Sequence, residues 1–399
     1  MNTHLPRRPS RALIPVLAAA LLAATAAAAH IYSPGVTAQP LQPMLDRWRQ
    51  RAAIPAVTVA VDGPNGSDVA ASGTAERGGR SPVTPDSQFR VASITKLFVA
   101  TVVLQLVQEG SIRLDDPLTE YLPEYGQGNG ATIRQLLNHT SGIPDYERVE
   151  GLNEDVVAHR DRRWSTQELL HLVSDLRPEF PAGTDTSYSN TDYVLLGRVI
   201  ERVTGATWPA QVRRRILTPL ALRHTHVSGA EPVPGGVVPG YMDIDQDGDE
   251  DKVETGQGWP ALDTTEAAAG AIVSTAPDLA AFATALFHHR LLNAATLQQM
   301  VTESPHHVRT SGYGLGVEVM RPDYRLTMLG HGGFTIGTRS ALWYAPEADV
   351  VVAVLANDAK ADPHDLAELV IRARLTGHGA ADNSPSTDQR APGRTSPLS

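Results

Sequence analysis

The pattern of hydrophobic and polar positions predicts strands near both ends of the chain. Short runs rich in β-branched and aromatic residues, bounded by turn-forming residues, are typical of strands. Such runs occur at Ala56–Asp62, Leu326–Leu329, Ser340–Tyr344 and Val350–Leu355. The last three follow one another closely, which favours consecutive antiparallel strands joined by turns.

The middle of the chain has apolar residues at helical spacing. Phe98–Gln108 is apolar almost all round and is followed by Gly110, which predicts a buried helix that stops at that glycine. Thr166–Ser174, Asp192–Thr204 and Pro277–Leu286 have the pattern of further helices. We therefore expect an α/β (α+β) protein in which both chain ends build one antiparallel sheet, with an all-helical region inserted between them.

The first 29 residues have the pattern of a secretory signal peptide. Arg7, Arg8 and Arg11 precede the uncharged, Ala- and Leu-rich run Ala12–Ala29, which ends in small residues suited to cleavage. The alternative is an uncleaved signal anchor, since a run of this length almost spans a bilayer. We expect residues 1–29 to be removed and the mature protein to be secreted or kept in the cell envelope without a membrane span.

Composition narrows the chemistry. The 399 residues include no cysteine and carry a formal net charge of −10. The absence of cysteine excludes disulfides, thiol catalysis and Cys-ligated metals. The negative net charge argues against a nucleic-acid partner.

From Gly377 onward the chain has almost no large apolar residues. We expect one catalytic domain over residues 38–375, a disordered tail over 376–399, and a monomer that acts on a small molecule.

Candidate chemistry begins at Ser93-Ile94-Thr95-Lys96, where the long apolar helix starts. Residues three apart share a helix face, so both polar side chains can point into one pocket. A serine hydroxyl needs a base to become a nucleophile, and a lysine in apolar surroundings has a lowered pKa suited to that role. Only three of the 34 basic residues are lysines. The alternative interpretation is a capping serine beside a surface lysine.

Two further motifs carry groups that fit the same reaction. Tyr188 and Asn190 flank Ser189 in a turn-rich stretch; a tyrosine held as phenolate can act as a base, and an asparagine can donate to a substrate carbonyl. His331-Gly332-Gly333 follows a strand-like run, and its glycines permit a close approach of the backbone. Taken alone, the Tyr-Ser-Asn triplet is more readily explained as an ordinary Tyr and Asn in a loop, and the alternative for the His-Gly-Gly motif is a turn between strands.

In this order and spacing the three motifs resemble those of the penicillin-recognising serine hydrolases. The most similar groups are the serine D-alanyl-D-alanine carboxypeptidases and the class C β-lactamases. The resemblance covers roughly residues 40–375 and includes the stretches Leu136–Gly142 and Gly312–Gly316. It implies a β-lactamase-like αβα sandwich with an all-helical region, and it implies no cofactor or metal.

The resemblance also implies a role for each candidate residue. Ser93 would be acylated, Lys96 and Tyr188 would share the work of the base, and Asn190 would position the substrate amide. His331, Gly332 and Gly333 would line the substrate cleft. The backbone N–H groups of Ser93 and Phe334 would form the oxyanion hole. The resemblance therefore implies a D-alanyl-D-alanine carboxypeptidase-like hydrolase that acts on a peptide of cell-wall type, within a family whose substrates are small peptides, esters or β-lactams.

Some positions depart from that family pattern and keep other substrates open. His331 stands where the β-lactamases usually have lysine, which argues against a dedicated β-lactamase. Glu318 stands near the place where such carboxypeptidases often have an arginine for the peptide carboxylate, and a glutamate repels that group. The alternatives are a carboxylesterase, or an amidase or aminopeptidase acting on D-residues. A β-lactamase or a non-catalytic penicillin-binding sensor is a weaker alternative.

One acidic segment matches a calcium-loop pattern. Asp243, Asp245, Asp247, Gly248 and Glu254 have the required spacing, but the flanking residues are poor helix formers. We therefore interpret the segment as a solvated acidic hairpin and expect no metal. Paired histidines elsewhere lack the carboxylate pattern of a metal site.

We predict that a calcium chelator leaves the melting temperature of the purified protein unchanged, because the acidic segment holds no ion. Calorimetry with and without the chelator tests this. A large drop that added Ca²⁺ reverses would show that the segment is a cation site.

Overall fold

The computed structural model describes residues 40–125, 129–244, 251–253, 259–305, 311–323 and 325–379. The predicted signal peptide lies outside these residues. Among the helices that they form, none combines the length and apolar character needed to cross a bilayer. The last helix ends at Gly379, so the first residues of the predicted tail are helical, and the rest of that tail is not described.

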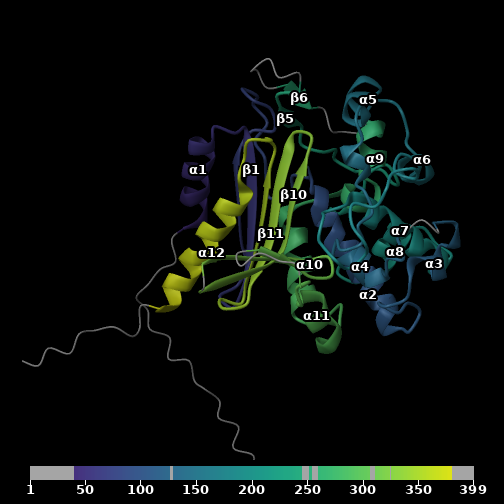
Figure 1. Ribbon diagram of the computed structural model, residues 1–399. Coiled ribbons are helices and arrows are strands. Elements are labelled where there is room, and N and C mark those ends of the chain that lie inside the picture. Colours follow the sequence, from purple (N-terminus) through teal and green to yellow (C-terminus); the bar gives the residue numbers. More distant parts are fainter. Residues whose placement is uncertain are drawn as a thin grey trace, which may run out of the picture. The chain divides into compact units, whose positions relative to one another are not determined.

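An antiparallel sheet of seven strands forms the centre of the described region (Figure 1). Strands from both ends of the chain meet in it, because β1 pairs with β12 and β12 pairs with β11. This confirms the predicted sheet. In spatial order its strands are β2 (Asp68–Gly73), β1 (Ala56–Asp62), β12 (Val350–Ala356), β11 (Thr338–Ala345), β10 (Leu326–Thr335), β9 (Glu318–Asp323) and β8 (Ser311–Tyr313).

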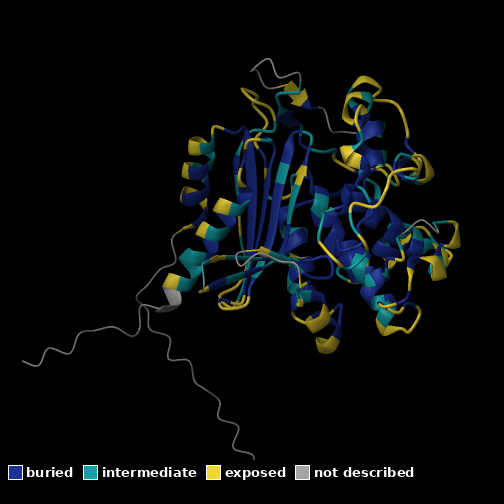
Figure 2. Cartoon of the chain, viewed as in Figure 1, coloured by how far each residue is buried: buried dark blue, intermediate teal, exposed yellow. Residues whose placement is uncertain are grey.

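Helices cover both faces of this sheet, as the αβα expectation required. α1 (Leu41–Ala52) and α12 (Pro363–Gly379) pack on one face, where Trp48 Nε1 of α1 donates to Asp365 Oδ2 of α12 at 3.0 Å. α10 (Ala276–Phe287) packs on the other face. The central strands β1 and β12 are buried almost throughout (Figure 2), which explains why their sequences are apolar runs rather than alternating ones.

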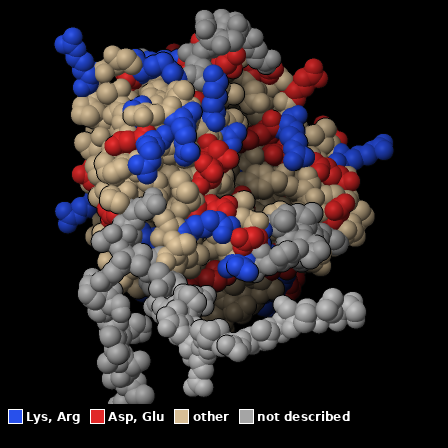
Figure 3. Space-filling view, turned by 90° about the vertical axis from the view of Figure 1, so that its left-hand side faces the viewer, with Lys and Arg blue, Asp and Glu red and all other residues tan. Residues whose placement is uncertain are grey.

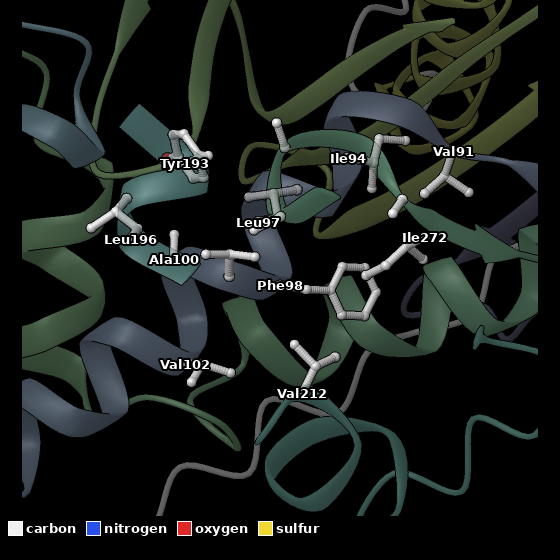
Figure 4. Close-up of a cluster of buried hydrophobic side chains, with 14 of the residues drawn as sticks. Val91, Ile94, Leu97, Phe98, Ala100, Val102, Tyr193, Leu196, Val212 and Ile272 are labelled. Carbon is white, nitrogen blue, oxygen red and sulfur yellow. The ribbon is translucent and has the colours of Figure 1, made fainter. Parts of the chain in front are cut away.

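The helical region lies beyond α10 and is organised around α2 (Thr95–Gln108). Nearly every residue of α2 is buried, and Leu97, Phe98 and Val102 lie within one apolar cluster (Figure 4). The other helices are α3 (Leu118–Tyr121), α4 (Ile133–Leu137), α5 (Leu152–Ala158), α6 (Thr166–His171), α7 (Asn190–Thr204), α8 (Trp208–Val212), α9 (Pro260–Gly270) and α11 (Ala294–Val301).

Two small sheets complete the described region. β7 (Ile272–Ser274) lies between β3 (Phe89–Arg90) and β4 (His226–Val227). β5 (Gly240–Met242) precedes the acidic segment Asp243–Glu254 and β6 (Asp251–Val253) lies near its end; the two strands pair antiparallel, as the arms of a hairpin do. Residues 245–250 and Glu254 of that segment lie outside the described residues.

The sequence located most elements and mistook some boundaries. The strand expected at Leu326–Leu329 continues to Thr335, so the His-Gly-Gly motif lies within β10 rather than in a turn. The helix expected at Thr166–Ser174 ends at His171. α12 was not predicted, because Pro363–Gly379 interrupts its apolar positions with charged residues.

A buried ion pair links the small sheet to α9. The side chains of Arg90 and Asp263 bond to each other and are 2% and 8% exposed. Asp263 also accepts a hydrogen bond of 2.6 Å from Ser228 Oγ. Since Arg90 lies just before Ser93 in the chain, this pair helps to place the nucleophile's segment against α9.

We predict that Asp263→Ala lowers the free energy of unfolding by about 3–5 kcal/mol, because it removes the carboxylate that compensates a buried guanidinium. Denaturant titration measures this. Asp115→Ala, which removes an exposed partner of Arg134, is the control and should cost less than about 1 kcal/mol. Equal losses in the two variants would contradict the structural role of the buried pair.

Candidate active site

Ser93 lies in a short 3₁₀ helix, Ala92–Ile94, that leads directly into α2. The residue before it, Ala92, has a φ of 48°, a left-handed backbone that is unusual for a residue with a Cβ. This turn presents Ser93 at the start of the helical segment, where the first N–H groups have no partner within the helix. Strain of this kind is found at active sites.

Neighbouring strands hold this turn from both sides. Val91 N–H donates to the carbonyl of Ile272 at 3.0 Å, and Ile272 N–H donates to Thr95 Oγ1 at 3.0 Å. Ser340 Oγ of β11 donates to the carbonyl of Val91 at 2.8 Å. The nucleophile is therefore fixed between the main sheet and the small sheet.

Lys96 is completely buried and donates to three oxygens. Its Nζ lies 3.0 Å from Ser93 Oγ, 2.7 Å from Asn190 Oδ1 and 2.9 Å from the carbonyl of Ala269. Burial lowers the pKa of Lys96 to about 8, against the opposing effect of nearby carboxylates. A substantial fraction of Lys96 is therefore neutral in mildly alkaline solution and can accept the serine proton.

A kink in α9 directs the carbonyl oxygen of Ala269 toward Lys96. Ala267 has a φ of 41° and a ψ of −138°, so the helical path is broken at this residue. The break turns the following backbone toward Lys96, so that the carbonyl of Ala269 accepts a hydrogen bond from Lys96 Nζ. Like Ala92, Ala267 is an alanine in a conformation that glycine adopts more readily.

Tyr188 lies beside the same pair of residues. Its hydroxyl hydrogen-bonds with Ser93, and its ring centroid lies 4.8 Å from Lys96 Nζ. Burial raises the pKa of Tyr188 well above its usual value. The resting side chain is therefore the neutral phenol, which differs from the phenolate that we expected and makes Lys96 the better proton acceptor.

The segment Leu136–Gly142 holds Tyr188 in place. The His139 ring lies 4.3 Å from the Tyr188 ring, and His139 Nδ1 accepts from Ser189 N–H at 3.2 Å. The same Nδ1 also lies 3.3 Å from Asp192 Oδ2. The family resemblance includes this segment, and its contact with Tyr188 gives it a structural role at the site.

Asn190 is the first residue of α7 and is oriented by Asp145. Its Nδ2 donates to Asp145 Oδ2 at 3.2 Å while its Oδ1 accepts from Lys96. One Nδ2 hydrogen thus remains for a substrate carbonyl. The structure brings Ser93, Lys96, Tyr188 and Asn190 together as predicted.

The His331 ring lies beyond the Tyr188 ring, further from Ser93. It is 1% exposed, its ring centroid is 6.2 Å from that of Tyr188, and its Nε2 lies 2.8 Å from the Tyr313 hydroxyl. Its Nδ1 lies 2.5 Å from the carbonyl of Gly332, so Nδ1 carries the proton and Nε2 accepts from Tyr313. Burial and the positive charge of Lys96 lower the pKa of His331 to about 3, which keeps the ring neutral.

The two glycines after His331 allow close contact with protein atoms. A Cβ on Gly333 would lie 2.3 Å from the carbonyl oxygen of Val91, so a side chain there would push β10 away from the turn that carries Ser93. A Cβ on Gly332 would lie 2.6 Å from the imidazole of His364. We expected these glycines to allow a close approach of the backbone to a ligand; in the structure they bring β10 against the Ser93 segment and α12.

Phe334 contributes to the site differently from its neighbours. Its side chain is 50% exposed and lies under the guanidinium of Arg339, 4.8 Å from the ring centroid. Because His331 and Phe334 occupy odd and even positions along a strand, their side chains lie on opposite faces. The oxyanion-hole role expected for Phe334 needs only its backbone N–H, so it is compatible with this orientation of the side chain.

Four carboxylates around Lys96 complete the site, and sequence analysis had singled out only one of them. They belong to Asp145, Glu147, Glu266 and Glu318, and all four favour the charged form of Lys96. Burial raises the pKa of Glu266, which bonds to Thr335 at the end of β10. Glu147 is exposed, but the surrounding protein and the neighbouring carboxylates raise its pKa. Their assembly depends on long-range packing, so no local motif signals it.

Within the described ranges, no group of three or more His, Asp or Glu side chains could hold a metal ion. Most of the acidic segment Asp243–Glu254 lies outside those ranges. The surface seen in Figure 3 carries basic and acidic side chains side by side rather than one field of a single sign.

Comparison with known proteins now identifies the family. The profile of the family described as Beta-lactamase matches residues 41–375. The chain belongs to the beta-lactamase family. This confirms the family resemblance and the fold expected from the sequence, and it makes the protein a serine hydrolase of the beta-lactamase fold.

The relatives within this family differ in their named activities. Penicillin-binding protein 4 of Amycolatopsis lactamdurans is 29% identical over 335 residues, covering 79% of this chain and 84% of that protein. A D-stereospecific amidohydrolase from Streptomyces sp. is 33% identical with a TM-score of 0.74, covering 86% of this chain and 99% of that one. D-amino acid amidase from Ochrobactrum anthropi SV3 is 28% identical with a TM-score of 0.75 and the same coverage.

We predict that the acylation rate of Ser93 rises with pH and levels off above an inflection near the Lys96 pKa of about 8. The reason is that only the neutral amine can accept the serine proton, and its fraction falls about tenfold per pH unit well below the pKa. The pH profile of kcat/KM with p-nitrophenyl acetate measures this. Ser93→Ala should have no turnover, and an unchanged inflection in Lys96→Ala would rule out this base.

Proposed function

We propose that this protein is an amidase that cleaves small amides bearing a free amino group, through an acyl-enzyme on Ser93. D-amino acid amides and peptides with an amino-terminal D-residue are the substrates that we favour. This is one of the alternatives left open by the sequence, and we prefer it to a D-alanyl-D-alanine carboxypeptidase. The observation that carries the proposal is the charge around the nucleophile.

Carboxyl groups are the main charged neighbours of Lys96. Asp145, Glu147, Glu266 and Glu318 all act electrostatically on it. Desolvation by the surrounding protein raises the pKa of these four carboxyls, so a bound cation favours their ionised forms, whereas a bound carboxylate opposes them. Such surroundings favour a substrate ammonium group over a carboxylate. Two arginines at the margin are hydrogen-bonded to backbone carbonyls, Arg148 to that of Tyr188 and Arg339 to that of Ala359.

The names of similar proteins support the same choice. The structures of a D-stereospecific amidohydrolase and of a D-amino acid amidase each match most of this chain. Their names also provide the argument for D-configured substrates. Arg321, the first arginine after Glu318, bonds to Glu303, which argues against its use as a clamp for a terminal carboxylate.

The proposed reaction begins with the transfer of the Ser93 proton to neutral Lys96. Ser93 Oγ attacks the amide carbon, and the N–H groups of Ser93 and Phe334 stabilise the oxyanion. As the C–N bond breaks, the Tyr188 hydroxyl protonates the leaving nitrogen, and the Lys96 ammonium returns a proton to Tyr188. Water then hydrolyses the acyl-enzyme with the same groups.

We also propose that the mature protein acts outside the cytoplasm, because of the signal-peptide pattern that ends at Ala29.

We predict that the protein hydrolyses D-phenylalanine amide at least about tenfold more efficiently than N-acetyl-D-phenylalanine amide, because acetylation removes the ammonium charge. Liberated ammonia measures both reactions. Glu147→Gln should raise KM for the free amine by about tenfold or more, with little effect on the acetylated compound. Glu150→Gln, an exposed glutamate three residues further on, is the matched control.

Equal hydrolysis of the two amides would contradict the proposed amine recognition. Turnover of p-nitrophenyl acetate with no amide cleavage would instead support the carboxylesterase alternative. Esterase EstB of Burkholderia gladioli is 36% identical over 174 residues, which cover 41% of this chain and 44% of that protein. Its name supports this alternative.

A further inference from the structure

Glu318 is one of the carboxylates that act on Lys96, but it takes no part in the proton transfers described above, although it lies next to β10, the strand that carries His331. Glu318 belongs to β9, where it pairs with Gly330 of β10. Its Oε1 lies 3.4 Å from His331 Nδ1, and its carboxylate accepts from the backbone N–H of Gly332. The side chain is 28% exposed, so a bound molecule can reach it.

Strand geometry places this carboxyl beside the oxyanion hole. β11 occupies one edge of β10, and β9 stops pairing at Gly330, so the other edge is open from His331 to Thr335. Alternate N–H groups of a strand point to the same edge. The N–H of Gly332, which meets Glu318, and the N–H of Phe334, which faces the oxyanion, are thus about 7 Å apart along that edge.

The leaving group departs on the Glu318 side of the scissile bond. Tyr188 is the group proposed to protonate the leaving nitrogen, and its ring lies beside that of His331. Glu318 acts electrostatically on Tyr188 as well as on Lys96. A leaving amine released next to Tyr188 therefore meets His331 and then the carboxyl of Glu318.

His364 of α12 supports the carboxyl from the other direction. Trp343 Nε1 donates to His364 Nδ1 at 3.1 Å, so the proton of the neutral imidazole is on Nε2, the nitrogen that lies beside Gly332. Glu318 and His364 lie close enough for the charge of each to shift the pKa of the other. His364 occupies the space next to Gly332 that a larger residue would fill.

We propose that Glu318 is a specificity-determining residue of the leaving-group subsite, which accepts ammonia or an amine without a carboxylate and rejects one that carries a carboxylate. The inference rests on the amide hydrolysis proposed above and extends it from the acyl side to the departing side. It needs no new covalent step, because Glu318 acts by charge on the group that Tyr188 has protonated.

Two dipeptide substrates that differ in one charge test this inference. D-alanyl-glycinamide and D-alanyl-glycine share the acyl group and the scissile bond, but only the second has a carboxylate. We expect wild-type kcat/KM to be at least about tenfold higher for the glycinamide, because like charges repel across a partly desolvated subsite. Glu318→Gln should reduce that ratio to about threefold or less, mainly by improving cleavage of D-alanyl-glycine.

Two variants separate charge from structure. Glu318→Asp keeps the charge and should keep a ratio close to that of the wild type. Glu368→Gln makes the same chemical change on α12, where Glu368 bonds to Arg372, and should also keep the ratio. A general loss of folding would lower both activities together and leave their ratio unchanged. A ratio that is the same in wild type and Glu318→Gln would overturn the inference.

A second measurement keeps the inference testable if the protein cleaves no D-aminoacyl amide. The acyl-enzyme formed from p-nitrophenyl acetate can be partitioned between water and an added amine, either glycinamide or glycine. An accepted amine enters by the path along which a leaving amine departs. Glu318→Gln should then favour glycine relative to glycinamide more than the wild type does. An unchanged partition would refute the role of Glu318 independently of the acyl preference.

Discussion

The ammonium group of Lys96 lies in the protein interior and donates to oxygens of Ser93, Asn190 and Ala269. These residues belong to different segments: the turn before α2, the start of α7 and the end of α9. A buried charge is costly unless it is paired and hydrogen-bonded, so these segments must converge for the fold to be stable. The packing that gives Lys96 its hydrogen-bond partners therefore also brings the catalytic groups together.

The surrounding carboxylates favour the charged form of Lys96. Burial alone favours neutral Lys96, and the carboxylates oppose it, which leaves the pKa at about 8. Asp145 has a second task, because it accepts from both the backbone and the side chain of Asn190. Electrostatic balance, orientation of the amide and the negative character of the site thus depend on one group of acidic residues. This coupling explains how a family that shares its proton-transfer groups can vary its substrates through the residues around them.

The sequence revealed the groups that are close along the chain and missed those that only folding brings together. Ser93 and Lys96 share one helical turn, and the β1 and β12 segments are apolar runs, so local patterns located them. Glu147 and Glu266 lie in unrelated segments, and their contact with the site depends on the packing of α9. The extension of β10 through the His-Gly-Gly motif was missed because glycine weakens a strand pattern; its cause is the close contact between Gly333 and Val91.

The position of β1 next to β12 has a consequence for the order in which the molecule can become active. During synthesis β1 and the segment that carries Ser93 emerge long before β12 and β10, with which they pack. The oxyanion donor, the imidazole of His331 and the open strand edge all come from the last quarter of the described chain. A nascent or truncated polypeptide that carries Ser93 and Lys96 therefore has no complete active site, and hydrolysis is restricted to molecules whose C-terminal strands have joined the sheet.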